Sequence, residues 1–246
     1  MAFTCFGLGG LLLTVLLVPL LNLLVWSQDL RRRWARMTVS LLFGGFIHLM
    51  VVLRLVTYEV HGRERLNRAG LLILANHPTL IDVVFLIWLV RNADCIVKAA
   101  LWRNPCTRGP LRAAGYICND AGEALVASST HSMDQGGNLI IFPEGTRSRP
   151  GEALRLQRGA AHIATRARRD VTPVRIHCAP LGLYKGQRWW QVAPRPLHFR
   201  ICVEDDIPVE PFLAEAAEPA LAARRLTDHL TWYFSNGHAS PARIGS

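Results

Sequence analysis

The stretch "LLILANHPTLIDVVFLIWLV", residues 71–90, sets the fold class of this chain. Its beginning, "LLILA", is a short, continuous apolar run of the kind that forms a strand buried on both faces. His77 and Pro78 then interrupt the apolar pattern. Proline is favoured at the first position of a helix and keeps the residue before it out of helical conformation. The stretch therefore predicts a buried strand, a turn at His77 and a helix from about Leu80.

The same alternation of strand and helix continues along the chain after residue 54. Further strands are expected at residues 55–60, 94–99, 138–142, 171–178 and 198–204, and helices up to about 114, from about 123, and at 156–169 and 214–234. Apolar strands alternating with helices are typical of an α/β domain. We predict a largely parallel central sheet flanked by helices, without internal repeats.

The N-terminal region is too apolar for a soluble domain. No charged side chain precedes Asp29, and the run at 5–26 is long enough to cross a bilayer core of about 30 Å as a helix. It lacks the basic leader of a secretory signal, so we interpret it as a retained anchor. The run at 38–53 is marginal for a span and either crosses the membrane or lies in its interface. We predict a membrane-associated helical segment at 1–54, an α/β domain at 55–236 and a loose tail at 237–246.

The charged residues indicate where the protein lies in the cell, but they do not distinguish between its possible functions. A net charge of +10 and a pI of about 10.1 suit an anionic membrane, anionic substrates or nucleic acid equally well. The arginines at 31–36 should stay on the cytoplasmic side, so either the first run crosses with its N-terminus outside or both runs form a re-entrant pair on the inner face. If only one run spans, the globular domain faces the cytoplasm, and we predict an inner-membrane protein of this orientation. The six cysteines include no C-x-x-C pair and no metal-ligand spacing, so they are read as core residues of a reducing compartment.

Two polar stretches carry the candidate chemistry. His77 and Asp82 would not meet on one continuous helix, but a turn at Pro78 lets Asp82 hold one ring nitrogen while the other serves as a base. The alternative for this pair is a histidine that only caps the helix. In "NLIIFPEGTRS", residues 138–148, a turn at Gly145 directs Glu144 and Arg147 to the space above the sheet. The alternative is a solvated turn.

Together these stretches resemble the glycerolipid acyltransferases of bacterial type. "NHPTLID" is similar to their N-H-x-x-x-x-D box and "FPEGTRS" to their F-P-E-G-T-R-S box, in the family's order and at about its separation. "KAALWRNP" and the pair "VTPV" and "RIHC" resemble two weaker blocks. The resemblance covers about residues 60–205.

The resemblance implies transfer of a fatty acyl group to the hydroxyl of a lysophospholipid. The acyl donor is acyl-CoA or acyl-carrier protein, attack is direct, and no cofactor or metal is implied. By similarity His77 is the general base and Asp82 orients it. Arg147 and, by analogy, Lys98 would bind the acceptor phosphate, and the other pocket residues implied are Glu144, Gly145 and Thr146.

The second block departs from the family pattern. The family usually reads Gly-x-Ile-Phe-x-x-Arg, whereas "GYICNDA" ends in Asn119, Asp120 and Ala121. The arginine commonly assigned to the acceptor phosphate is therefore missing. Either Arg103, Arg108 or Arg112 replaces it, or the acceptor is another lyso-lipid or hydroxy-acyl compound.

Two rival functions are weighed against acyl transfer. A lipid or phosphate ester hydrolase would need water as nucleophile, because the chain has no G-x-S-x-G elbow, no P-loop and no acidic metal cluster. A basic membrane-binding or nucleic-acid-binding protein is suggested by "RRRWAR" and "RARR", but such runs are usually solvated faces. No basic strand interleaved with aromatic residues points to stacking on bases, so nucleic acid is not expected as a partner.

Overall fold

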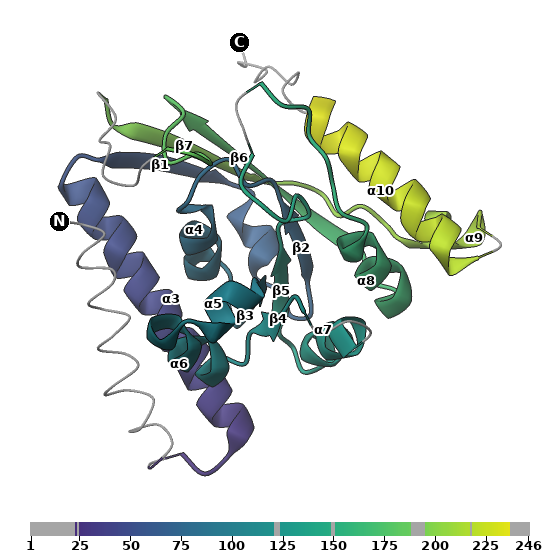
Figure 1. The fold of residues 1–246 in the computed structure, drawn as a ribbon, viewed down its shortest axis with the longest axis horizontal. Helices are drawn as coiled ribbons and strands as arrows, with labels where there is room; N and C mark the ends of the chain where they lie inside the picture. The colour runs from purple at the N-terminus through teal and green to yellow at the C-terminus, as the bar shows by residue number, and fades with distance from the viewer. Residues whose placement is uncertain are drawn as a thin grey trace.

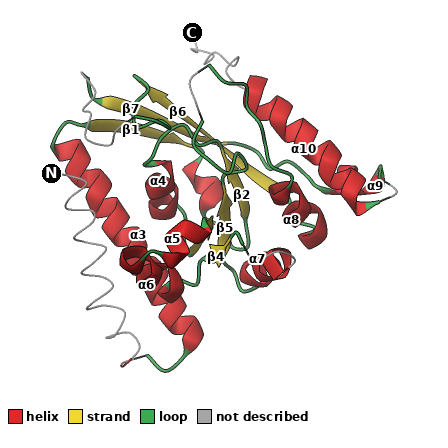
Figure 2. Cartoon of the chain, in the orientation of Figure 1, coloured by secondary structure: helices red, strands yellow, loops and turns green. Residues whose placement is uncertain are grey.

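A seven-stranded mixed sheet forms the centre of the molecule (Figures 1 and 2). The computed structural model describes residues 23, 25–120, 124–148, 151–187, 195–216 and 218–236. Its strands are β1 (Val56–His61), β2 (Leu72–Ala75), β3 (Ala93–Val97), β4 (Ile117–Cys118), β5 (Asn138–Ile141), β6 (Val171–Ala179) and β7 (Leu197–Val203), in the order β1-β7-β6-β2-β5-β3-β4. The strands β2 to β6 are mutually parallel, whereas β7 is antiparallel to β6 and parallel to β1. The predicted fold class is confirmed, and the short β4 is an addition to the predicted strands.

Helices cover both faces of the sheet. The strand β2 is apolar throughout because it is buried on both faces. The helices are α3 (Gln28–Val52), α4 (Asp82–Leu89), α5 (Ala99–Arg103), α6 (Pro105–Ala113), α7 (Ala124–Asp134), α8 (Gly159–Ala167), α9 (Glu210–Ala214) and α10 (Pro219–Asn236), with a 3-10 turn η2 (Arg63–Leu66). Side chains alternate along a strand. Ile73 and Ala75 pack in the core with α3 and α4, and Leu72 and Leu74 pack in the core with α8 and α10.

The N-terminal helix α3 lies along the α/β domain and packs against α4 (Figure 1). It contains the arginine cluster and the apolar run up to Val52 in one continuous helix. By length and composition alone, α3 could cross a membrane. The predicted span at 5–26, except residues 23, 25 and 26, and the predicted tail at 237–246 lie outside the described residues. The division of the chain at residue 54 stays a prediction.

A buried ion pair fastens α3 to the sheet. Arg36 donates from Nη2 to Asp94 Oδ2 at 2.7 Å and from Nε to the Ala114 carbonyl at 2.8 Å. The two charged side chains are 4% and 1% exposed. Burial raises the pKa of Asp94, while Arg36 and the hydroxyl of Ser132 act in the opposite direction. Arg36 thus interrupts the apolar face of α3 without ending the helix, because its charge is compensated.

We expect Arg36→Met to lower the free energy of unfolding by about 3 to 5 kcal/mol, since Asp94 is left buried without its counter-charge. Urea unfolding of the purified chain measures the loss. Arg33→Met, an exposed site on the same helix, should change stability by no more than about 0.5 kcal/mol. The double replacement Arg36→Met with Asp94→Leu should recover most of the loss. Equal stability of the Arg36→Met and Arg33→Met proteins would contradict the role given to the ion pair.

Candidate active site

The predicted site residues gather where the parallel strands end. His77 follows β2, Lys98 follows β3 and the turn at residues 144–147 follows β5. Because β2, β3 and β5 are parallel and neighbours in the sheet, these residues share its carboxyl edge. This is the edge at which open α/β sheets place their ligand sites.

His77 and Asp82 form a hydrogen-bonded pair across the turn that the sequence predicted. His77 Nδ1 lies 2.9 Å from Asp82 Oδ2, and the Asp82 side chain is fully buried. Asp82 also accepts from Thr79, at 2.6 Å from the backbone N–H and 2.5 Å from the hydroxyl. The helix α4 begins at Asp82 rather than near Leu80, with Ile81 at its N-cap, so Asp82 lies in the first turn of the helix.

The environment of Asp82 favours an oriented imidazole. Burial raises the pKa of Asp82, and the hydrogen bonds from His77 and Thr79 act against that rise. The hydrogen bonds from Thr79 and His77 stabilise the charged form of the carboxyl group, and His77 Nδ1 is the donor on the imidazole. This arrangement puts the proton of the neutral ring on Nδ1 and leaves the lone pair on Nε2.

The imidazole of His77 is fixed in plane and open on one side. Its ring stacks on Phe142, with centroids 4.3 Å apart and an interplanar angle of 29°. The side chain is 17% exposed. Within the described part of the chain, Nε2 makes no hydrogen bond. The ring can therefore accept a proton from a group that reaches it from solvent or lipid.

Glu144 holds the backbone of His77 in place through a hydrogen bond. Its Oε1 accepts from the His77 N–H at 2.8 Å, and its Oε2 accepts from the Ser148 hydroxyl at 2.7 Å. The Ser148 N–H in turn donates to the His77 carbonyl at 2.8 Å. Gly145 has φ of +66°, and a Cβ there would meet only Gln157 Cγ at 3.6 Å, so backbone conformation and not space requires glycine. Both oxygens of Glu144 are thus occupied by protein donors.

The cations assigned to the acceptor phosphate differ in their surroundings. Arg147 donates from Nη1 to the carbonyls of Leu183 and Tyr184, at 2.9 Å and 3.2 Å. Thr146 beside it is half-buried. Lys98 is exposed at the start of α5, and its ammonium makes no hydrogen bond or ion pair with any described residue.

The second block offers no obvious replacement for the missing arginine. Arg103 pairs with Asp120 at 3.3 Å on the surface, and the Arg112 guanidinium lies 6.0 Å from the centre of the Trp102 ring. Arg108 is exposed, and Ala121 lies outside the described residues. Two of the three arginines considered from sequence already have partners.

Sequence reasoning missed several residues that build the site. Thr79 carried a usable signal, because "TLID" before an apolar run is a capping-box pattern in which the acid bonds the backbone N–H three residues earlier. Phe142 and Ser148 lie inside the predicted box but were given no role. Nothing in the sequence around Leu183 and Tyr184 indicated a place in the site. They reach it because they follow β6, whose carboxyl end lies at the same edge of the sheet.

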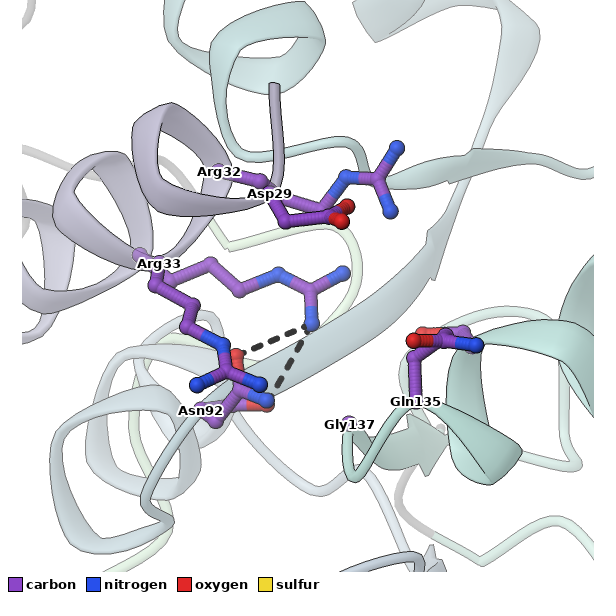
Figure 3. Close-up of a pocket in the computed structure, with 8 residues that line it drawn as sticks. Asp29, Arg32, Arg33, Asn92, Gln135 and Gly137 are labelled. Atoms are coloured by element: carbon purple, nitrogen blue, oxygen red, sulfur yellow. Dashed lines mark hydrogen bonds between the residues drawn. The ribbon is translucent and has the colours of Figure 1, made fainter. Parts of the chain in front are cut away.

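A hollow shown in close-up in Figure 3 is lined by residues from the opposite end of the strands. It is lined by residues of α3 and of the segments before β3 and β5, namely Asp29, Arg32, Arg33, Arg36, Asn92, Ser132, Gln135 and Gly137. Since it lies at the amino ends of β3 and β5, it contains none of the predicted site residues. Of its arginines, Arg36 is already paired with Asp94.

Comparison with known proteins bears on the fold and on the family of this chain. Residues 57–177 match the family model described as acyltransferase. A 1-acyl-sn-glycerol-3-phosphate acyltransferase of Limnanthes douglasii is 26% identical over 204 residues, which are 79% of this chain and 69% of the relative. One from Helicobacter pylori is 30% identical over 130 residues, which are 47% of this chain and 55% of the relative. The crystal structure of the acyltransferase PlsC from Thermotoga maritima matches with a TM-score of 0.67 at 18% identity, over 94% and 92% of the two chains.

Proposed function

We propose that this chain, which belongs to the acyltransferase family through its domain at residues 57–177, moves a fatty acyl group from a thioester to the hydroxyl of a lysophospholipid. The family expected from "NHPTLID" and "FPEGTRS" is thereby confirmed, and the enzyme is an O-acyltransferase of the 1-acylglycerol-3-phosphate type. The observation that carries the mechanism is the His77 ring, held at Nδ1 by a buried carboxylate and open at Nε2.

The reaction follows from the state of that ring. A lipid hydroxyl is a poor nucleophile near neutral pH, so Nε2 of His77 takes its proton as the oxygen attacks the thioester carbonyl. The new C–O bond forms, the C–S bond breaks, and the thiol leaves with the proton that His77 accepted. Asp82 stabilises the imidazolium that exists between these two transfers. The residues require no acyl-enzyme, metal or cofactor for this sequence of steps.

The substrates are assigned by chemistry. We take a lysophosphatidate-like lipid as acceptor, with its phosphate between Lys98 and the free donors of Arg147. Because the second block lacks its arginine, another lyso-lipid or hydroxy-acyl acceptor is the alternative. The donor is acyl-CoA or acyl-carrier protein.

Thiol release measured with and without acceptor tests the function against a lipid ester hydrolase. We expect release from acyl-CoA to require lysophosphatidate or one member of a panel of lyso-lipids, with the doubly acylated lipid as product. A lipid without a free hydroxyl serves as the control acceptor. Release at the same rate without any acceptor would mean that water is the nucleophile, and would overturn acyl transfer.

We also propose that α3 contacts the cytoplasmic face of the inner membrane. Leu30, Trp34, Met37 and Leu41 are exposed by 49% to 67% and recur at the spacing of one helical face. Large apolar side chains on an exposed helix face favour the interface of a bilayer. This face supports membrane contact whether α3 crosses the bilayer or lies on it.

In a chain that starts at Ser27 and so lacks the predicted anchor at 5–26, Trp34→Glu combined with Leu41→Glu should weaken binding to phospholipid vesicles by at least about tenfold, because two apolar groups in the interface become charged. Sedimentation with vesicles gives the partition coefficient. The matched control is Leu221→Glu with Trp232→Glu, also exposed apolar residues but on α10. If both double variants bind vesicles as the unmodified chain does, the membrane contact does not lie on α3.

A further inference from the structure

Three segments that are far apart in sequence meet around His77. Two of them are the turn at 77–82 and the turn at 144–148, which Glu144 and Ser148 join. The third is the segment at 183–187, which follows β6 and belongs to neither box of the resemblance. Hydrogen bonds link this third segment to both of the others.

The carbonyl of Leu183 is the point at which the segments are joined. It accepts from the Leu80 N–H at 3.0 Å and from Arg147 Nη1 at 2.9 Å. Leu80 lies between Thr79 and Asp82, so this bond fixes the turn that presents the carboxylate to His77. At the end of β6, burial raises the pKa of the Cys178 thiol to about 11; a backbone hydrogen bond with Gly182 acts against this rise, and the charge of Asp82 adds to it.

The conformation of Leu183 indicates that the segment is held, not merely close. Leu183 has φ of +56° and is 8% exposed. A bulky residue in the left-handed region persists only where its surroundings determine it. Here Gln187 supplies that constraint, since its Oε1 accepts from the Leu183 N–H at 2.5 Å and its own N–H donates to the Tyr184 carbonyl at 3.2 Å.

We propose that the 183–187 segment is a fixed wall of the acceptor pocket and that Gln187 and Arg147 are positioning residues which hold it against the His77 turn. Gln187 closes the segment on itself, and Arg147 ties it to the second box. This proposal deepens the proposed function, and only the kinetic part of its test rests on that function. Hydrogen exchange measures how firmly the segment at 183–187 is held, whether or not the protein transfers acyl groups.

Arg147 then has two roles that use different donors. A guanidinium carries five N–H groups, and the two wall contacts both use Nη1. Nε and Nη2 have no partner among the described residues, which leaves them for an acceptor phosphate. Binding of the phosphate and placement of the wall are therefore coupled through one planar group. Gln187 bonds only within the wall and has no proposed contact with the phosphate, so a substitution there tests the wall without changing phosphate binding directly.

The decisive comparison is Gln187→Met with Gln187→Glu in the full chain. Methionine keeps the length of the side chain but cannot accept well, so amide exchange in peptides covering 77–82 and 181–187 should become faster. The kcat should fall about fivefold, as for a lost hydrogen bond, with an unchanged midpoint of thermal unfolding. Glutamate still accepts from the Leu183 N–H, so Gln187→Glu should keep both slow exchange and most of kcat. Unchanged exchange and kcat in the Gln187→Met protein would overturn the proposal.

Arg147→Lys separates the wall from the phosphate. We expect faster exchange at 181–187 together with a higher acceptor KM, while Arg155→Lys, an exposed arginine nearby in sequence, changes neither. A higher KM with unchanged exchange would mean that Arg147 serves the phosphate only, and the positioning role would fail. Faster exchange with an unchanged KM would keep the positioning role and refute the phosphate contact of the proposed function.

Discussion

Replacing His77 with alanine should lower kcat/KM for acyl transfer by at least about 10² to 10⁴, the contribution usual for general-base catalysis. The substrate hydroxyl then has no proton acceptor, because the imidazole that Asp82 orients has been removed. Steady-state kinetics with acyl-CoA and the acceptor found by the panel measure the loss. The midpoint of thermal unfolding should fall only modestly, since buried Asp82 keeps both hydrogen bonds from Thr79 when the ring is removed.

A second histidine provides the control for this result. His162 is half-buried on α8, on the other face of the sheet, and His162→Ala removes a ring of the same size. Its kcat/KM should stay within about threefold of the unmodified enzyme, as for a substitution outside the site. If the His77→Ala protein is folded and transfers acyl groups at a near-normal rate, His77 only caps α4, and the mechanism proposed for it is wrong.

The parts of the site that sequence predicted are those with local causes. Pro78 forces a turn directly after an apolar strand, and that turn is what brings His77 back to Asp82. Gly145 adopts a positive φ at the end of β5, as its place in a tight turn suggested. In both cases a residue type with a narrow conformational preference stands next to the group that it positions. The fold class followed similarly, because strands buried on both faces must be apolar on both faces.

The parts that sequence did not predict depend on distant partners. Arg36 was read as one of a surface cluster, and only the packing of α3 across the sheet brings it to Asp94, 58 residues away. The role of Leu183 arises likewise from its meeting with Leu80 and Arg147. Neither residue type has a local preference that reveals these contacts. A charge inside an apolar helix is a clue only when its counter-charge is already known.

Asp82→Asn should lower kcat by about 10² to 10⁴ while leaving the fold intact. The amide oxygen can take the place of Oδ2, which accepts from both His77 Nδ1 and the Thr79 N–H. The amide NH₂ then faces the Thr79 hydroxyl, which can rotate and accept a hydrogen bond. Orientation of the ring is therefore retained, and the main loss is the negative charge that stabilises the imidazolium.

Combining Asp82→Asn with His77→Ala tests whether the two residues act as one unit. The only function given to Asp82 is to orient and stabilise the imidazole, so it has nothing to act on when the ring is absent. The double variant should consequently be no slower than His77→Ala alone, as expected for groups whose effects are not additive. Single-turnover rates of the three variants and the unmodified enzyme complete the cycle. Multiplied losses would mean that Asp82 acts on the substrate independently of His77, which its complete burial behind the ring makes physically hard to reconcile.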